Sequence, residues 1–236
     1  MPNLSRTAWW IESRQTMSDI SQRMGELALL GGALCLDFVN TAGWRGQPDT
    51  AGVLRDYEDL VVWAEHAGAL DEKERRDFLR AAEAEPKEAA AAHRRAIALR
   101  EAIYGIFSAA AAAHRAPEPD DVELLNEAVA DAFRHLCLAP TASGFSWEWR
   151  GAEGALELPL WKVARSAADL LVSPELGRVR ECAGEKCDWL FLDASRNRSR
   201  RWCDMAVCGN RAKAQRNYAR RRGSAVAERA GKERKT

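Results

Sequence analysis

The chain has 236 residues, an apolar fraction of 47% and a formal net charge of zero, with 35 basic and 35 acidic side chains. This length suits one sizeable domain plus a small module, and the abundant alanine favours helices. No apolar run approaches 18 residues and the N-terminus lacks a basic-then-apolar signal pattern, so we expect a cytoplasmic protein without a membrane span.

The net charge of zero conceals a division along the chain. Residues 178–236 contain 17 Lys and Arg against 7 Asp and Glu, a net charge of +10, so the first 177 residues carry −10. Such asymmetry favours an acidic body with a basic end that binds nucleic acid.

Residues 1–24 show no hydrophobic periodicity, and we predict a flexible extension there. The adjacent Trp9 and Trp10 leave a docked arm open as the alternative. The body of the protein is expected over residues 25–177.

The segment LCLDFV, residues 34–39, alternates with a period of two and predicts a short strand. Polar residues lie at its end. They either cap a turn next to the strand or line a small ligand pocket together with two residues of a later helix. The candidate pocket residues are Asp37, Asn40, Thr41, Arg165 and Ser166.

Capping residues and apolar spacing predict a mostly helical body. Asp56 and the pair Asp71 and Glu74 are typical of helix starts, and Pro117 and Pro140 of helix ends. The expected helices cover residues 57–66, 71–84, 87–115, 120–138 and 160–172, with a short turn capped by Ser173.

A β-hairpin is expected between the last two of these helices. FSWEW, residues 145–149, alternates cleanly, Gly151 to Gly154 can turn, and Leu156 and Leu158 alternate again. The predicted fold class is therefore α+β, mostly α. It comprises a helical domain with a short strand and a hairpin, a small treble-clef-like zinc finger over residues 178–222, and a disordered basic tail over 223–236.

Four of the six cysteines predict a metal site. They form two pairs with four residues inside each pair and fifteen between the pairs: Cys182, Cys187, Cys203 and Cys208. Four thiolates at about 2.3 Å suit one tetrahedral Zn²⁺, and such a closed site is structural because no position is left for water. An iron–sulfur cluster and a disulfide framework are the alternatives, but no secretion signal supports disulfides.

Basic side chains surround these cysteines. A loop follows a strand-like segment that contains Trp189 and Phe191, and a helix over residues 212–222 is expected after Asn210 as its cap. Arginine pairs well with phosphate, although part of this charge could balance the zinc thiolates. The predicted DNA contacts are Arg196, Arg198, Arg200, Arg201, Arg211, Lys213, Arg216, Arg220 and Arg221, with Gln215 and Asn217 as candidate readers of adenine.

The segment Arg178–Tyr218, which includes CAGEKCDWLFLDASRNRSRRWC and CGNR, resembles the CGNR zinc finger family. LCLDFVNT at Leu34–Thr41 and LWKVARSAADLL at Leu160–Leu171 resemble the ABATE domain, which usually precedes that finger. The resemblance implies a stress-induced bacterial transcription regulator in which the four cysteines bind zinc and the finger binds DNA.

The leading hypothesis is a zinc-dependent DNA-binding transcription regulator without catalytic residues. In it, the acidic domain senses a small molecule or forms a homodimer. A redox or metal sensor that loses zinc when its thiolates are oxidised is the first alternative. An enzyme that uses the N-terminal pocket is the second.

Overall fold

The computed structural model describes residues 20, 22, 24–42, 45, 52–112, 115–151, 154–218 and 220. Most of the predicted N-terminal extension, Arg221 and the tail over 223–236 lie outside these residues. The body is built from α2 (Leu34–Val39), α3 (Tyr57–His66), α4 (Glu72–Ala84), α5 (Pro86–Ala111), α6 (Pro119–His135) and α7 (Leu158–Leu171). Within the described part of the chain, no helix has the length and apolarity that crossing a membrane requires.

The helix starts follow the predicted chemistry in α3 and α4. The Asp56 side chain accepts a hydrogen bond from Asp59 N, and Asp71 and Glu74 form a reciprocal capping box. The helix predicted over residues 120–138 begins at Pro119, with Glu118 rather than Asp120 or Asp121 as its N-cap, and ends at His135.

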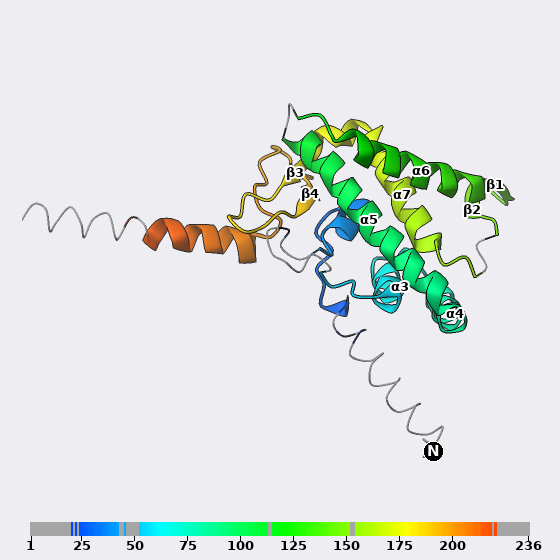
Figure 1. Cartoon of the computed structure of the whole chain (residues 1–236). Helices are drawn as coiled ribbons and strands as arrows, with labels where there is room; N and C mark the ends of the chain where they lie inside the picture. Colours follow the sequence, from blue (N-terminus) through cyan, green and yellow to red (C-terminus); the bar gives the residue numbers. More distant parts are fainter. Residues whose placement is uncertain are drawn as a thin grey trace, which may run out of the picture.

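The long helix α5 crosses the body and packs against the other helices (Figure 1). The core between them is built from fully buried large side chains, with Phe38 of α2 and Trp63 of α3 in contact at 5.1 Å between ring centroids. Ile20 and Met24 are buried in this core as well. The flexible extension predicted for residues 1–24 is therefore wrong for these two residues.

The predicted strand over residues 34–39 is the short helix α2. Four of its six residues are buried, because it is covered by α5, α7 and the strand β4 (Leu190–Leu192), which belongs to the C-terminal module that contains Cys182, Cys187, Cys203 and Cys208 (the cysteine module). A short apolar run that is buried on all sides looks the same in sequence as a helix or a strand. The Asp37 carboxylate accepts a hydrogen bond from Gly31 N at 2.7 Å and fixes the turn in front of the helix.

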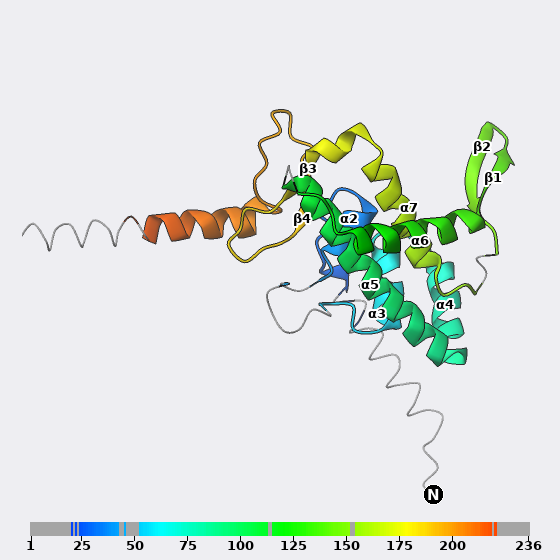
Figure 2. The same ribbon diagram turned by 45° about the horizontal axis from the view of Figure 1, so that its top comes forward.

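The predicted hairpin exists, but the strand predicted to pair with residues 145–149 was the wrong one. β2 (Gly144–Trp149) pairs antiparallel with β1 (Leu136–Thr141), whereas Leu158 begins α7. Pro140 does not end a helix but lies in β1, where an edge strand tolerates its missing N–H. The hairpin projects from the end of α6 (Figure 2) and exposes Leu138, Phe145 and Trp147.

The cysteine module follows α7 through a short 3-10 turn, η1 (Pro174–Arg178), which Ser173 caps as predicted. Its hairpin consists of β3 (Val179–Glu181) and β4 (Leu190–Leu192). A π-turn, η2 (Met205–Gly209), continues into a helix over residues 210–218, which extends away from the body (Figure 1). A mostly helical chain with two small antiparallel hairpins and a C-terminal cysteine cluster confirms the predicted fold class.

Candidate metal centre and nucleic-acid interface

The four predicted ligand cysteines lie together, and all their sulfur atoms are within 4.8 Å of one another. The Sγ of Cys203 is 3.6 Å from that of Cys187 and 3.7 Å from that of Cys208. Four sulfurs at about 2.3 Å around a tetrahedral ion would be about 3.8 Å apart. The distances between the sulfurs therefore match those expected around one zinc ion.

The short distances between the sulfurs also couple their ionisation. Hydrogen bonds from Cys187 and Cys203 hold the pKa of the Cys182 thiol well below its usual range. The same hydrogen bonds to Cys182 raise the pKa of Cys187 and Cys203. The cluster therefore favours one thiolate among thiols, and a bound divalent cation would favour ionisation of the remaining sulfurs.

The backbone of the β3–β4 hairpin positions the first cysteine pair. Cys182 N donates to Trp189 O at 2.9 Å, and Cys187 N donates to Gly184 O at 3.0 Å. A Cβ on Gly184 would lie 3.2 Å from Cys187 Cβ and 3.4 Å from Cys208 Sγ, so a larger residue there would have to displace the ligand cysteines slightly. The first pair thus lies in the loop that connects the two strands of the hairpin.

The second pair is placed by the start of the C-terminal helix. Asp204 caps η2 by accepting a hydrogen bond from Ala206 N, and Cys208 lies four residues further, where η2 joins the helix. Asn210 is inside the helix and donates to Ala206 O, so its prediction as the cap was wrong. A thiolate at a helix N-terminus is favoured by the helix dipole.

The loop between β4 and Cys203 is ordered by a buried carboxylate. Asp193 accepts hydrogen bonds from Ser195 N, Ser195 Oγ and Arg200 N, and its side chain is fully buried. Arg198, at the tip of this loop, has a φ of 48°, in the left-handed region. Asp193 therefore holds the loop in a shape that exposes Arg196 and Arg198.

Arg200 differs from its neighbours. Its guanidinium donates to the backbone oxygens of Trp202, Cys203 and Leu30, and it stacks 4.2 Å above the ring centroid of Phe191. Phe191 is fully buried and packs against three of the ligand cysteines, where it shields the metal site from solvent. The Arg200 guanidinium is therefore used to stabilise the fold of the module.

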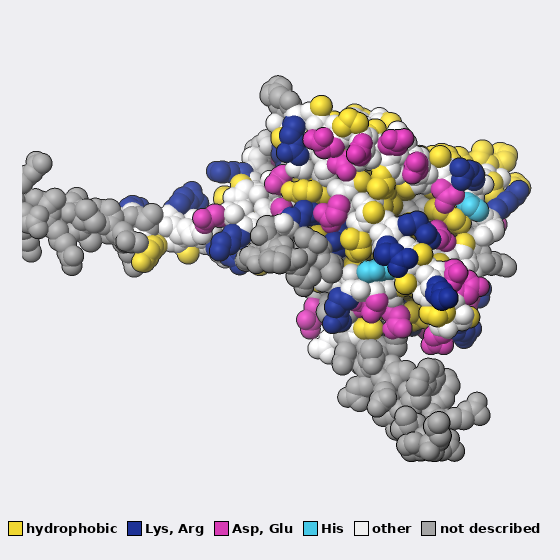
Figure 3. Space-filling view, viewed as in Figure 1, with side chains coloured by type: hydrophobic (Ala, Val, Ile, Leu, Met, Phe, Trp, Pro, Cys, Tyr) yellow, Lys and Arg dark blue, Asp and Glu magenta, His cyan; other side chains and the backbone are white. Residues whose placement is uncertain are grey.

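The remaining predicted basic residues that the structure describes are exposed. Three of those on the C-terminal helix, Lys213, Arg216 and Arg220, share one face, where they line a shallow groove of about 410 Å³ together with Asn217. Arg211 is exposed but does not line this groove. Gln215 is engaged with the Glu185 carboxylate at 2.6 Å. Figure 3 shows Lys and Arg side chains along this helix, away from the acidic side chains of the body.

Comparisons with known families identify both parts of the chain. Residues 32–174, more than half of the chain, match the model of the ABATE family, described as "Putative stress-induced transcription regulator". The chain belongs to the ABATE family. Residues 178–221 match the CGNR zinc finger, in the predicted order after the ABATE domain. No curated protein sequence matches the chain.

The match to the CGNR zinc finger agrees with the cysteine geometry. Cys182, Cys187, Cys203 and Cys208 of the finger form the site of one structural zinc ion. All four positions around the ion are taken by thiolates, so the metal would organise the finger and would not bind a substrate. Neither family description is that of an enzyme.

The CGNR finger is attached to the ABATE domain through buried polar contacts. The Asn40 amide donates to Leu190 O at 2.8 Å, and its Oδ1 accepts from Leu190 N at 2.9 Å. Leu192 N donates to Gly31 O at 2.8 Å. Strand β4 is thus held by the residues on either side of α2, and its Leu190 belongs to the core of the ABATE domain.

A charged cluster forms a second connection between the domains. Arg45 N donates to the Asp188 carboxylate at 2.8 Å, and the Arg45 guanidinium pairs with Glu101 at 2.8 Å. Ser108 of α5 donates to the Glu181 carboxylate of β3 at 3.0 Å. None of these residues was singled out from the sequence, because their partners are 56 to 143 positions away.

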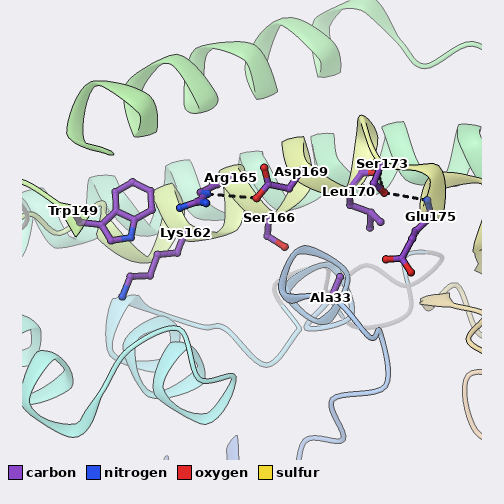
Figure 4. Close-up of a pocket in the computed structure, with 9 residues that line it drawn as sticks. All are labelled: Ala33, Trp149, Lys162, Arg165, Ser166, Asp169, Leu170, Ser173 and Glu175. Carbon is purple, nitrogen blue, oxygen red and sulfur yellow. Dashed lines mark hydrogen bonds and ion pairs between the residues drawn. The ribbon is translucent and has the colours of Figure 1, made fainter. Parts of the chain in front are cut away.

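The five predicted pocket residues are divided between two places. Arg165 and Ser166 line a surface pocket of about 530 Å³ along α7, below which lies Ala33 (Figure 4). Asp37, Asn40 and Thr41 do not line it. Thr41 accepts a weak hydrogen bond from the buried Arg100 at 3.5 Å and donates to Phe38 O. Asp37 fixes the turn before α2, as the capping alternative expected, whereas Asn40 holds the finger and Thr41 bonds the end of α2.

The charges in this pocket along α7 already have partners. Arg165 pairs with Asp169 at 3.4 Å (Figure 4). Arg165 also stacks on Trp147, and Lys162 donates to Ala69 O. Ser166 Oγ accepts a hydrogen bond from Cys35 N at 3.2 Å. The polar groups that could hold a ligand are therefore used to hold α2 and the hairpin against α7.

Proposed function

We propose that the chain is a zinc-dependent DNA-binding transcription regulator whose C-terminal helix contacts DNA. One observation carries this proposal: the helix that begins beside the zinc ligand Cys208 exposes Lys213, Arg216 and Arg220 along one groove. Because zinc fixes the first turn of the helix, the basic face is held in a defined direction. Contacts to phosphate would supply most of the affinity.

The proposed contact surface has two parts. The helix contributes Arg211, Lys213, Arg216 and Arg220, and the loop ordered by Asp193 contributes Arg196, Arg198 and Arg201, all exposed. Arg221 remains in the proposal from its sequence position alone. Arg200 is left out because its guanidinium is held inside the module. Asn217 lies in the basic groove, where its amide could read an adenine edge.

A salt titration tests this proposal. We expect the full chain to bind a duplex of about 25 base pairs with a log–log salt slope near −5, for about six phosphate contacts. Replacing Lys213 and Arg216 together by Ala should make the slope shallower by about 2 and weaken binding at least about tenfold. Fluorescence anisotropy of labelled DNA measures both quantities.

The matched control removes the same charge elsewhere. Arg76→Ala with Arg80→Ala deletes two exposed side chains of α4, which pair only with Glu72 and Asp77 within that helix among the described residues. The control should leave affinity and slope unchanged. No binding by the unmodified chain at low salt, or equal losses in both double variants, would overturn the proposal.

We further propose that two copies of the chain act together on DNA. One short helix and one loop cover few base pairs, and a second finger would double the number of phosphate contacts. The stoichiometry of the same titration measures this directly.

A DNA-binding regulator of a bacterial cell works where the genome is, in the cytoplasm.

The two alternative functions have weaker support. Cys182, Cys203 and Cys208 are each at most 6% exposed, which favours a protected structural zinc over a redox switch. The enzyme hypothesis required its five pocket residues to share one cavity. They are divided between a surface pocket and the contacts of α2, so no catalytic group is proposed.

A further inference from the structure

A groove between three helices of the ABATE domain has the properties of a ligand site. Its volume is about 380 Å³, within the range of pockets for small molecules. Its apolar lining comes from α5, α6 and α7: Ala98, Leu99, Leu124, Ala128, Leu160 and Trp161. None of the five residues predicted for the N-terminal pocket lies in it.

The Trp161 indole gives the groove a rigid aromatic wall. Its Nε1 donates to the Asp131 carboxylate at 2.8 Å, and the His135 ring stacks on it at 3.9 Å between centroids. Trp161 is 5% exposed, so its position is fixed by packing from both sides. Most of the indole is covered by protein, so the small part that faces the groove is preformed and needs little ordering on binding.

The rim of the groove is acidic. Three carboxylates and one guanidinium line it, a net charge of −2: Glu127, Asp131, Glu157 and Arg95. Arg95 pairs directly with Glu157, and Asp131 is also paired with Arg134, which lies outside the lining. Glu127 is exposed and has no ion pair with any residue in the part of the chain that the structure describes. Figure 3 shows acidic side chains gathered over α6.

We propose that this groove binds a hydrophobic cation, such as a flat aromatic ring system that carries one positive charge. The apolar lining would displace water from the ring system, and the carboxylate of Glu127 would face the positive charge. An anion of the same shape would meet net negative charge. This binding is independent of the proposed DNA contacts, since the groove and the basic helix share no residue.

Rhodamine 6G, a flat lipophilic cation, is a suitable probe, and fluorescein is an anion of similar shape. Titration of the full zinc-loaded chain without DNA, followed by fluorescence anisotropy, should show saturable binding of rhodamine 6G. Fluorescein should bind at least about tenfold more weakly. Equal binding of both dyes would show that charge does not select the ligand, and would overturn the proposal.

Two kinds of variant locate the site. Glu127→Lys should weaken rhodamine 6G binding about tenfold, whereas Glu148→Lys, the same change on the exposed polar face of the hairpin, should have no effect. Ala128→Phe on α6 should abolish binding by filling the groove. If this variant fails to fold, Ala98→Phe on α5 fills the groove from the other side and should have the same effect. Unchanged binding by a folded filled variant would contradict the groove as the site, whatever the outcome of the DNA titration.

Discussion

Removal of zinc is expected to unfold residues 182–218 and to lower the thermal stability of the whole chain. The core of the finger contains one fully buried aromatic, Phe191, among the ligand cysteines. Zinc binding contributes about 10–16 kcal/mol in finger peptides, which is as large as the total stability of a typical domain. Without the metal, so small a core cannot offset the entropy of ordering the segment.

The effect should reach the ABATE domain because the two parts share a core. Val179 and Leu190 are fully buried within the main hydrophobic cluster, although both belong to the finger hairpin. Loss of the hairpin would expose these side chains and the apolar surfaces they cover, at roughly 1.5–3 kcal/mol for each. The helices should still form, but with a lower melting temperature.

Cys187→Ser tests this expectation without a chelator. The variant should bind less zinc, and protease should cut it between residues 182 and 218. Cys137→Ser is the control, because Cys137 is also half-buried but lies in the β1–β2 hairpin, outside the cluster. A Cys187→Ser chain that retains its zinc and its protease resistance would show that the four cysteines are not the ligands.

Asn40→Asp is expected to destabilise the chain by about 3 kcal/mol, the largest effect we expect from a change of this size. The Asn40 side chain is 6% exposed, and its amide matches both backbone groups of Leu190. Aspartate has the same shape but cannot donate when ionised, so an oxygen would face Leu190 O at 2.8 Å. An unsatisfied buried carbonyl and a buried charge both cost free energy.

Thermal unfolding measures the change. For a chain of this length, about 3 kcal/mol lowers the melting temperature by roughly 6–12 °C. Asn126→Asp makes the same substitution at an exposed position of α6 and should change the melting temperature by less than about 2 °C. Equal shifts in the two variants would mean that the Asn40 contact does not hold the finger.

Local chemistry made several parts of this structure predictable. Asp56 and Asp71 cap helices because their side chains bond the next backbone N–H groups, a relation contained within four residues. The spacing of the cysteines is equally local and led to the metal site. The basic face of the C-terminal helix was predictable because Lys213, Arg216 and Arg220 follow the helical period.

Other features depend on residues far apart in the chain. Asn40 was seen only as polar, because its partner Leu190 is 150 positions away. Residues 34–39 are covered by α5, α7 and β4, and the sequence of a short buried apolar run does not distinguish a helix from a strand. β1 was missed because Pro140 looked like a helix stop, although its apolar residues match those of β2 across the hairpin. The groove exists only once α5, α6 and α7 are packed.

The DNA affinity of the full chain, measured over a range of salt concentrations with zinc bound and after its removal, tests the central claim most directly. We predict a slope near −5 for the zinc-loaded chain, at least about tenfold weaker binding with a shallower slope after chelation, and recovery when Zn²⁺ is restored. The same affinity and slope with and without zinc would contradict the claim that the metal holds the basic helix in place for DNA.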